Sequence, residues 1–260
     1  MKTMDLNKPY AGWSLFIGGM YGSGKTTLIG DMLQYEQPRG KVAYVMTPQE
    51  GDEHKGGWRS IAGLNIAESY LVESYEDLKK LMKQFRSGAY QAVGLDQLCG
   101  VASLIRLALL GENRMPNTTL KRNEYGEINA EFQSFVREWN NGVKYSLMVA
   151  PTDVTTKDDQ TGQTPAMQDL PTANKFIRPM MEWSKLEFLI PGMFDLCFHL
   201  ETTGFSSILK RELLVRQGKQ YSNKQRLPKH MRMEKNIELS DDLKNWEKIV
   251  RHLEEGGSHG

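Results

Sequence analysis

The sequence predicts an α/β domain with a mostly parallel β-sheet that is covered by helices on both faces. Short, continuously apolar segments of strand length alternate with segments of helical periodicity through the first 200 residues. Continuously apolar strands are typical of sheets buried on both faces. Parallel neighbours also need crossover connections, which are usually helices. The predicted strands are residues 14–17, 42–46, 70–72, 92–95, 146–150 and 196–200, and the predicted helices are residues 26–35, 75–86, 98–110, 128–140 and 181–189.

The pattern changes after about residue 202. Residues 211–217 and 219–223 resemble a strand pair around Gly218, which predicts antiparallel strands added to the sheet near the C-terminus. A final helix is expected over residues 241–254, after the N-cap candidate Ser240. We predict one domain over residues 1–255, whose late part (about 203–255) holds the basic strand pair and the last helix, and a flexible tail over 256–260.

Composition narrows the class of protein. The 260 residues include 33 Lys and Arg against 32 Asp and Glu, a net charge of +1, which excludes a globally basic protein but not a local basic patch. Cys99 and Cys197 are too few for a disulfide scaffold, and both are expected to be small core residues in a reducing cytoplasm. No apolar run approaches the roughly 20 residues that span a bilayer, so no membrane contact is expected.

Residues 19–26 read GMYGSGKT, a full match to the phosphate-binding motif GxxxxGK[ST]. The motif follows a predicted strand and opens a predicted helix, as it requires. Its glycines let backbone N–H groups turn toward phosphate oxygens, and the helix N-terminus adds partial positive charge. The alternative is a chance glycine-rich turn, which does not explain why a predicted strand precedes the motif and a predicted helix follows it. The expected contacts of a nucleoside triphosphate are Gly19, Tyr21, Gly22, Ser23, Gly24, Lys25, Thr26 and Thr27, with Lys25 at the β- and γ-phosphates and the Thr26 hydroxyl at Mg²⁺.

An acidic residue ends a later buried strand. Residues 90–96 read YQAVGLD, and Asp96 stands where a carboxylate would bind Mg²⁺ directly or through water. The alternative is an aspartate that caps a turn. Because the phosphate-binding motif of residues 19–26 (the P-loop) occurs in the same chain, a Mg²⁺ ligand is the better interpretation of Asp96.

Hydrolysis also needs a group that orients or deprotonates water. Gln97 follows Asp96, so the Asp-Glu pair of many motor ATPases is missing. The strand after the P-loop helix ends in Gln49 and Glu50. Glu50 is the predicted catalytic base and Gln49 its rival, while an exposed loop carboxylate is the alternative. Residues 151–153, PTD, could present a γ-phosphate sensor, although a plain turn explains them as well.

These residues together resemble the RecA-like branch of P-loop NTPases, and in particular the small phage-encoded Sak-type single-strand annealing and recombination proteins. The similarity runs over most of the chain in the segments WSLFIGGMYGSGKTT, YQAVGLD, YSLMVAP, PGMFDLCFHL and YSNKQR. It implies a RecA-like core with one strand between the P-loop strand and the Asp96 strand, a catalytic glutamate after the second strand, and ATP and Mg²⁺ as cofactors. The chain departs from the family at Gln97, where Ser or Thr is usual, and at Thr152, where His is frequent.

A basic stretch near the C-terminus suggests two further functions. The resemblance implies that Lys224 and Arg226 act in a neighbouring subunit, where they stabilise γ-phosphate charge and make activity depend on assembly into a ring or filament. A basic surface hairpin is the alternative. Residues 210–235 hold nine Lys or Arg against Glu212 and Glu234, and Phe205 and Tyr221 offer stacking surfaces for single-stranded DNA. A solvated basic face would have the same composition.

Two long polar stretches, residues 111–126 and 152–173, are predicted to be loops, which at this length are usually functional or disordered. In the RecA-like branch such loops face DNA. The first suits this role, since it carries Arg114, Lys121, Arg122 and Tyr125. Residues 152–169 carry a net charge of minus three, from four Asp against one Lys, and do not suit phosphate contact.

The sequence therefore predicts an oligomeric ATPase that acts on single-stranded DNA in phage-type recombination or annealing, in the cytoplasm of a bacterial host. Two alternatives stay open. One is a nucleotide-gated interaction protein or packaging ATPase with little DNA-stimulated turnover. The other is a P-loop kinase for a small molecule or nucleotide, although few arginines converge in residues 111–126.

Overall fold

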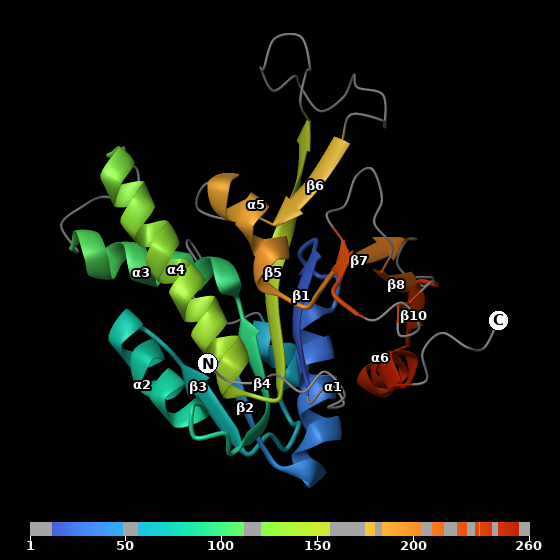
Figure 1. The fold of residues 1–260 in the computed structure, drawn as a ribbon. Coiled ribbons are helices and arrows are strands. Elements are labelled where there is room, and N and C mark those ends of the chain that lie inside the picture. Colours follow the sequence, from blue (N-terminus) through green and yellow to red (C-terminus); the bar gives the residue numbers. More distant parts are fainter. Residues whose placement is uncertain are drawn as a thin grey trace, which may run out of the picture.

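The computed structural model describes residues 12–48, 57–111, 121–156, 175–179, 184–203, 210–215, 223–227, 232–233, 235–240 and 244–254. These residues form an α/β fold with a ten-stranded sheet flanked by helices (Figure 1). The strands are β1 (Trp13–Gly19), β2 (Lys41–Met46), β3 (Glu68–Leu71), β4 (Tyr90–Asp96), β5 (Tyr145–Thr156), β6 (Lys175–Pro179), β7 (Leu196–Thr203), β8 (Lys210–Leu214), β9 (Lys224–Gln225) and β10 (Ile237–Leu239). The helices are α1 (Lys25–Glu36), α2 (Tyr75–Phe85), α3 (Leu98–Leu110), α4 (Arg122–Gly142), α5 (Ser184–Met193) and α6 (Asn245–Glu254), with short 3-10 helices η1 (Gln37–Arg39) and η2 (Gly57–Ile61).

The sheet is parallel in its centre and antiparallel at one side. The strand order is β10-β8-β7-β1-β5-β4-β2-β3, with β6 added to β5 and β9 to β7. The strands from β7 to β3 pair in parallel. The late strands β8, β9 and β10 pair antiparallel, as β6 does with the end of β5. The predicted mostly parallel sheet with antiparallel strands near the C-terminus is confirmed.

Apolar side chains cover both faces of the sheet, which explains why the central strands are continuously apolar. In β1, Leu15 and Ile17 belong to the cluster beneath α1 and α6, whereas Phe16 belongs to the cluster beneath α2, α3, α4 and α5. Figure 1 shows α1 and α6 apart from the group of α2, α3 and α4. Strand alternation therefore builds two separate cores, one on each face of the same sheet.

The helix that starts in the first predicted loop is longer than expected. The expected helix over residues 128–140 begins at Arg122 in the structure, so Arg122 and Tyr125 are helical rather than in a loop. The Glu124 carboxylate accepts a hydrogen bond from the Lys121 backbone N–H at 2.7 Å and caps this start. The first turns are polar and therefore lack the apolar periodicity that marks a helix.

The second predicted loop is partly a β-hairpin. β5 runs through Thr156, beyond the expected end at residue 150, and pairs antiparallel with β6. Residues 154–156 and 175–177 read VTT and KFI, and β-branched and aromatic residues favour strands. Figure 1 shows this hairpin projecting past the ends of the neighbouring strands. The acidic residues 157–174 between β6 and β5 lie outside the described residues.

The late strand β8 confirms part of the predicted strand over residues 211–217. β8 lies between β7 and β10 and pairs antiparallel with both. Residues 216–222, with Gly218, lie outside the described residues. The last helix begins at Asn245, whose side-chain oxygen accepts from the Ser240 backbone N–H at 2.8 Å, so Ser240 precedes the helix by five residues and is not its N-cap.

Gly94 allows the P-loop helix to contact the sheet directly. A Cβ atom on Gly94 would lie 2.1 Å from Cγ2 of Ile29 in α1. Gly94→Ala should lower the free energy of unfolding by about 1–3 kcal/mol, because the added methyl group pushes α1 away from β4. Gly126→Ala in α4 is the matched control: no atom lies within 4 Å of a Cβ there, and better helix propensity should add up to about 1 kcal/mol. Urea unfolding measures both, and a loss of equal size in the two variants would contradict the packing argument.

Candidate functional site

The loop between β1 and α1 has the backbone that its glycines predict. Gly22 and Gly24 have φ values of 76° and 96°, which are unfavourable for residues other than glycine. A Cβ atom on Gly19 would lie 2.7 Å from both the Leu200 carbonyl oxygen and the Ser23 hydroxyl. The loop is thus closely packed against β7, and it places the N-terminus of α1 at the carboxyl ends of the parallel strands, where α/β sheets bind ligands.

Lys25, the first residue of α1, folds back into this loop. Its ammonium group donates hydrogen bonds to the carbonyl oxygens of Gly19 at 2.7 Å and Met20 at 2.8 Å. The side chain is buried, and burial lowers the pKa of Lys25 to about 8 despite the opposing charge of Asp96. Hydrogen bonds to neutral carbonyl groups are weaker than those to an anion, so the ammonium of Lys25 can exchange these two partners for a phosphate or another anion.

Thr26 and Asp96 come together although they lie on different elements. The Thr26 hydroxyl donates to Oδ2 of Asp96 at 2.6 Å, and the Tyr44 hydroxyl donates to the same oxygen at 3.1 Å. Burial raises the pKa of Asp96, while these two hydrogen bonds and Lys25 oppose the rise. A carboxylate beside a threonine hydroxyl offers the hard oxygen ligands that Mg²⁺ prefers. Sequence reasoning proposed these two residues as Mg²⁺ ligands, and the structure brings their side chains together.

Strand register explains this meeting. β5 lies between β1 and β4, and Ile17, Val149 and Asp96 stand at one level across the three strands. Asp96 therefore ends its strand beside the start of the P-loop. In the described part of the chain, no three His, Cys, Asp or Glu side chains gather as a protein-only metal cluster. The pair suits Mg²⁺, which usually keeps waters and phosphate oxygens among its ligands.

The chain leaving β2 is tied to the residue after Asp96. The Thr47 hydroxyl donates to the Gln97 carbonyl oxygen at 2.6 Å and accepts from the Gln97 N–H at 3.1 Å. The Asp96–Gln97 peptide bond is cis. Gln49 and Glu50 follow two and three residues after Thr47 but lie outside the described residues, so the predicted base stays a prediction.

Buried hydroxyl groups without partners gather at this end of the sheet. Among the described residues, the buried hydroxyls that lack a hydrogen-bond partner are those of Ser23, Thr152 and Thr202. They lie in the P-loop and in the carboxyl-terminal parts of β5 and β7. Leaving a buried polar group unpaired costs about 1–3 kcal/mol. Three such groups at the carboxyl end of the sheet would be satisfied by a polar ligand that binds there.

His199 and Thr152 approach the P-loop strand from its two neighbours. A Cβ atom on Gly18 would lie 2.7 Å from Cγ2 of Thr152 and 3.9 Å from Nδ1 of His199. Burial, with a smaller contribution from Lys25, lowers the pKa of His199 to about 4, so the imidazole is neutral at physiological pH. Sequence analysis named Thr152 as part of a possible γ-phosphate sensor. It did not name His199, because a single histidine in a buried strand resembles a core residue.

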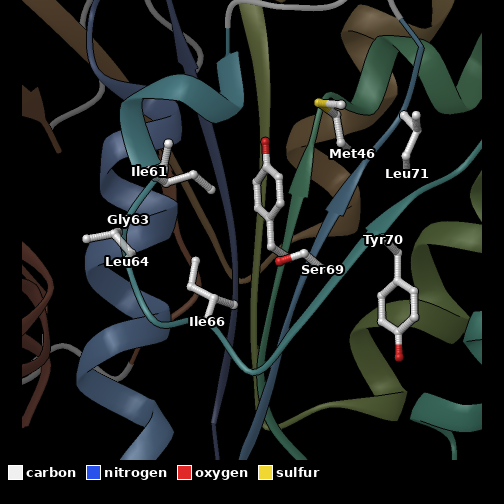
Figure 2. Close-up of a pocket in the computed structure, with 10 residues that line it drawn as sticks. Met46, Ile61, Gly63, Leu64, Ile66, Ser69, Tyr70 and Leu71 are labelled. Atoms are coloured by element: carbon white, nitrogen blue, oxygen red, sulfur yellow. The ribbon is translucent and has the colours of Figure 1, made fainter.

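Sequence reasoning also did not identify Tyr44 as a hydrogen-bond partner of Asp96, although the hydroxyl of a buried tyrosine usually has such a partner. Behind its ring lies a cavity of about 400 Å³. Figure 2 shows Ile61, Leu64 and Ile66 along one wall of this cavity, with Met46 on the other side. The cavity is mainly apolar and differs in this from the polar surroundings of Asp96.

Lys224 and Arg226 lie away from the P-loop of their own protomer. β9 pairs with the first residues of β7, whereas the P-loop is level with the later residue Leu200. The Lys224 ammonium donates to the Pro191 carbonyl oxygen at 2.7 Å, and the Arg226 guanidinium donates to that of Gly192 at 2.5 Å. These carbonyls belong to the last turn of α5, so the basic pair caps the negative end of that helix.

The remaining predicted residues are placed as follows. Tyr21 is 65% exposed, with its ring 5.9 Å from the Lys25 ammonium, and Thr27 lies half-buried in the first turn of α1. Cys197 is buried in the core as expected, but Cys99 is only partly buried and its thiol donates to the Gln97 side-chain oxygen at 3.2 Å. Arg114 lies outside the described residues.

No protein-family model matches the chain, and no curated protein shows significant sequence similarity to it. None of the helices that the structure describes combines the length and apolar character of a membrane span.

Proposed function

We propose that the protein is a RecA-like ATPase that binds ATP and Mg²⁺ at the loop between β1 and α1 and acts on single-stranded DNA in recombination or annealing. The hydrogen bond from Thr26 to Asp96 at 2.6 Å carries the proposal, because it joins the phosphate-binding motif to a carboxylate on a different strand. A chance glycine-rich turn would not need such a partner. The unpaired hydroxyls of Ser23 and Thr152 support a polar ligand at the same place.

Each residue of the site has a distinct role in this proposal. Lys25 leaves the carbonyls of its own loop and neutralises phosphate charge. Thr26 and Asp96 hold Mg²⁺, which polarises the phosphoryl group when bound. Thr152 donates to the terminal phosphate, and Glu50 positions the attacking water. The sheet order supports the RecA-like branch, since β5 lies between the P-loop strand and the strand of Asp96.

The position of the basic pair Lys224 and Arg226 supports the proposed assembly. Lys224 and Arg226 lie at the amino-terminal end of β7, so they cannot serve the P-loop of their own protomer without a large rearrangement. A role in phosphate chemistry therefore requires a neighbouring subunit. In the proposed ring or filament, this pair stabilises transition-state charge in the adjacent site.

ATP hydrolysis by the purified protein, with and without poly-dT, tests the proposal. We expect turnover that DNA stimulates and that Arg226→Ala lowers by about 10³-fold or more, the range of a finger supplied in trans. Arg251→Ala on α6 is the matched control, because its side chain is 64% exposed and pairs only locally with Glu247. Turnover that ignores DNA would favour a packaging ATPase or kinase. ATP binding without turnover would favour a nucleotide-gated interaction protein.

The pH dependence of ATP binding should report Lys25. Its pKa of about 8 in the free protein should rise when a phosphate becomes its partner, so binding above pH 8 takes up a proton. Affinity should then fall by up to about tenfold per pH unit as pH rises above this value. Calorimetry in two buffers of different ionisation enthalpy at high pH measures the proton uptake. Lys25→Arg, which stays charged, should lose this dependence; the same steep profile in that variant would contradict the assignment.

A further inference from the structure

Arg211 lies against the phosphate loop, although it is far from it in the sequence. Its Cδ and Nε atoms are 3.4 Å, and its Cζ atom 3.7 Å, from the position that a Cβ atom on Gly24 would occupy. Gly24 immediately precedes Lys25 and is the N-cap of α1. The side chain of Arg211 thus runs along the loop at the positive end of this helix.

Strand pairing on both sides of β8 fixes the backbone position of Arg211. It stands on β8, between Thr202 of β7 and Leu239 of β10, and both neighbouring strands pair with it antiparallel. Leu213, two residues on, is fully buried in the cluster beneath α1 and α6. Because residues two apart share a face of a strand, Arg211 is on the face that carries α1. Its approach to Gly24 therefore follows from the register of β8.

A second observation points to a ligand at the same place. Thr202 is directly opposite Arg211 across the β7–β8 pair, so the two side chains share one face. The Thr202 hydroxyl is buried without a hydrogen-bond partner among the described residues. A guanidinium group beside an unsatisfied hydroxyl offers several donors to an anion.

We propose that Arg211 binds the phosphate chain of the nucleotide held by the P-loop of its own protomer, with the Thr202 hydroxyl as a second donor. This rests on the proposed nucleotide binding. The N-terminus of α1, Lys25 and Arg211 then place positive charge around one loop, which suits a polyphosphate better than a singly charged anion. Arg211 acts in cis, in contrast to Lys224 and Arg226, whose contribution requires a neighbour.

The position of Arg211 also determines which phosphates it binds. Backbone groups of a P-loop hold the α- and β-phosphates, whereas the γ-phosphate lies toward the lysine and the metal. Arg211 approaches the loop at Gly24, and its strand β8 is separated from β4, the strand of Asp96, by β7, β1 and β5. It should therefore stabilise ADP and ATP alike and act on nucleotide affinity rather than on the chemical step.

Equilibrium binding of fluorescent ATP and ADP analogues tests this inference, measured over a dilution series of protein. Arg211→Ala should weaken both nucleotides by about 10–100-fold at every protein concentration, since hydrogen bonds to charged groups contribute about 1.5–3 kcal/mol. KM for hydrolysis should rise by a similar factor while kcat stays within a few-fold. Arg211→Lys should restore part of the affinity, and Thr202→Val should weaken it a few-fold. Arg251→Ala is the control and should bind as the wild type does.

The outcomes separate this inference from the proposed function. Wild-type binding that is lost in Lys25→Ala but unchanged in Arg211→Ala would overturn the role of Arg211 and leave the ATPase proposal standing. A loss confined to ATP, or one that grows with protein concentration, would overturn the cis assignment. No binding of either nucleotide by the wild type would overturn both. Thermal unfolding without nucleotide shows whether each variant is folded, and Arg211→Gln replaces the alanine variant if that one is not.

Discussion

Lys25→Ala should abolish measurable nucleotide binding and, with it, hydrolysis. The ammonium is buried in the loop, where it donates hydrogen bonds to the carbonyl oxygens of Gly19 and Met20, so it is placed to meet the phosphates that we propose bind there. Loss of one charged hydrogen-bonding group costs about 1.5–3 kcal/mol, and loss of neutralisation for several phosphate charges adds to this. We expect ATP affinity to fall by at least about 100-fold. Calorimetric titration with MgATP measures it directly.

The control for this prediction is stability without nucleotide. Burial lowers the pKa of Lys25, which means that the fold does not favour its charged form. Removing the side chain should therefore change the thermal midpoint of the nucleotide-free protein only slightly. MgATP should raise the midpoint of the wild type and leave that of Lys25→Ala unchanged. An equal rise in both proteins would place nucleotide binding outside the P-loop.

Local signals made the conformation of the loop between β1 and α1 predictable, whereas contacts between distant segments were not predictable. The motif and its flanking strand and helix are contiguous, and the structure gives the loop the positive φ values that its glycines suggest. Asp96 could be proposed as a site residue because a carboxylate that ends an apolar strand is visible in the sequence. Arg211 was counted only as one charge in a basic stretch, because its contact with Gly24 depends on the register of β8.

The errors in element boundaries have a common physical cause. The first turns of α4 are polar, and residues 152–156 of β5 read TDVTT, so neither has the continuous apolar pattern by which the elements of this sheet were recognised. The partners of the late strand β8 could not be predicted, because they are not its neighbours in the sequence pattern around Gly218. In the structure, β8 pairs instead with β7 and β10, where Leu213 completes the core beneath α6.

Asp96→Asn should lower Mg²⁺-dependent hydrolysis by about 10²–10³-fold, the usual loss when one group that stabilises transition-state charge is removed. Asparagine has the same shape and can still accept the hydrogen bonds of Thr26 and Tyr44, but it offers a neutral oxygen to Mg²⁺. Nucleotide affinity measured in EDTA should stay within a few-fold of the wild type. Turnover against Mg²⁺ concentration is the measurement, and Glu76→Gln in α2, an acid-to-amide change at a side chain that is 70% exposed, is the control. Hydrolysis within tenfold of the wild type would exclude Asp96 as the metal ligand.

The same substitution should not destabilise the protein, and this separates a functional residue from a structural one. Burial raises the pKa of Asp96, so its ionised form is less favourable in the folded than in the unfolded state. The unfolded state then binds fewer protons than the native state between the two pKa values, and stability falls as pH rises through that window. At pH 7 to 8, Asp96→Asn should therefore be at least as stable as the wild type in thermal unfolding. Burial disfavours the ionised form of Asp96, yet its carboxylate accepts a hydrogen bond from Thr26. This is the arrangement we expect if Asp96 holds a cation in the proposed function.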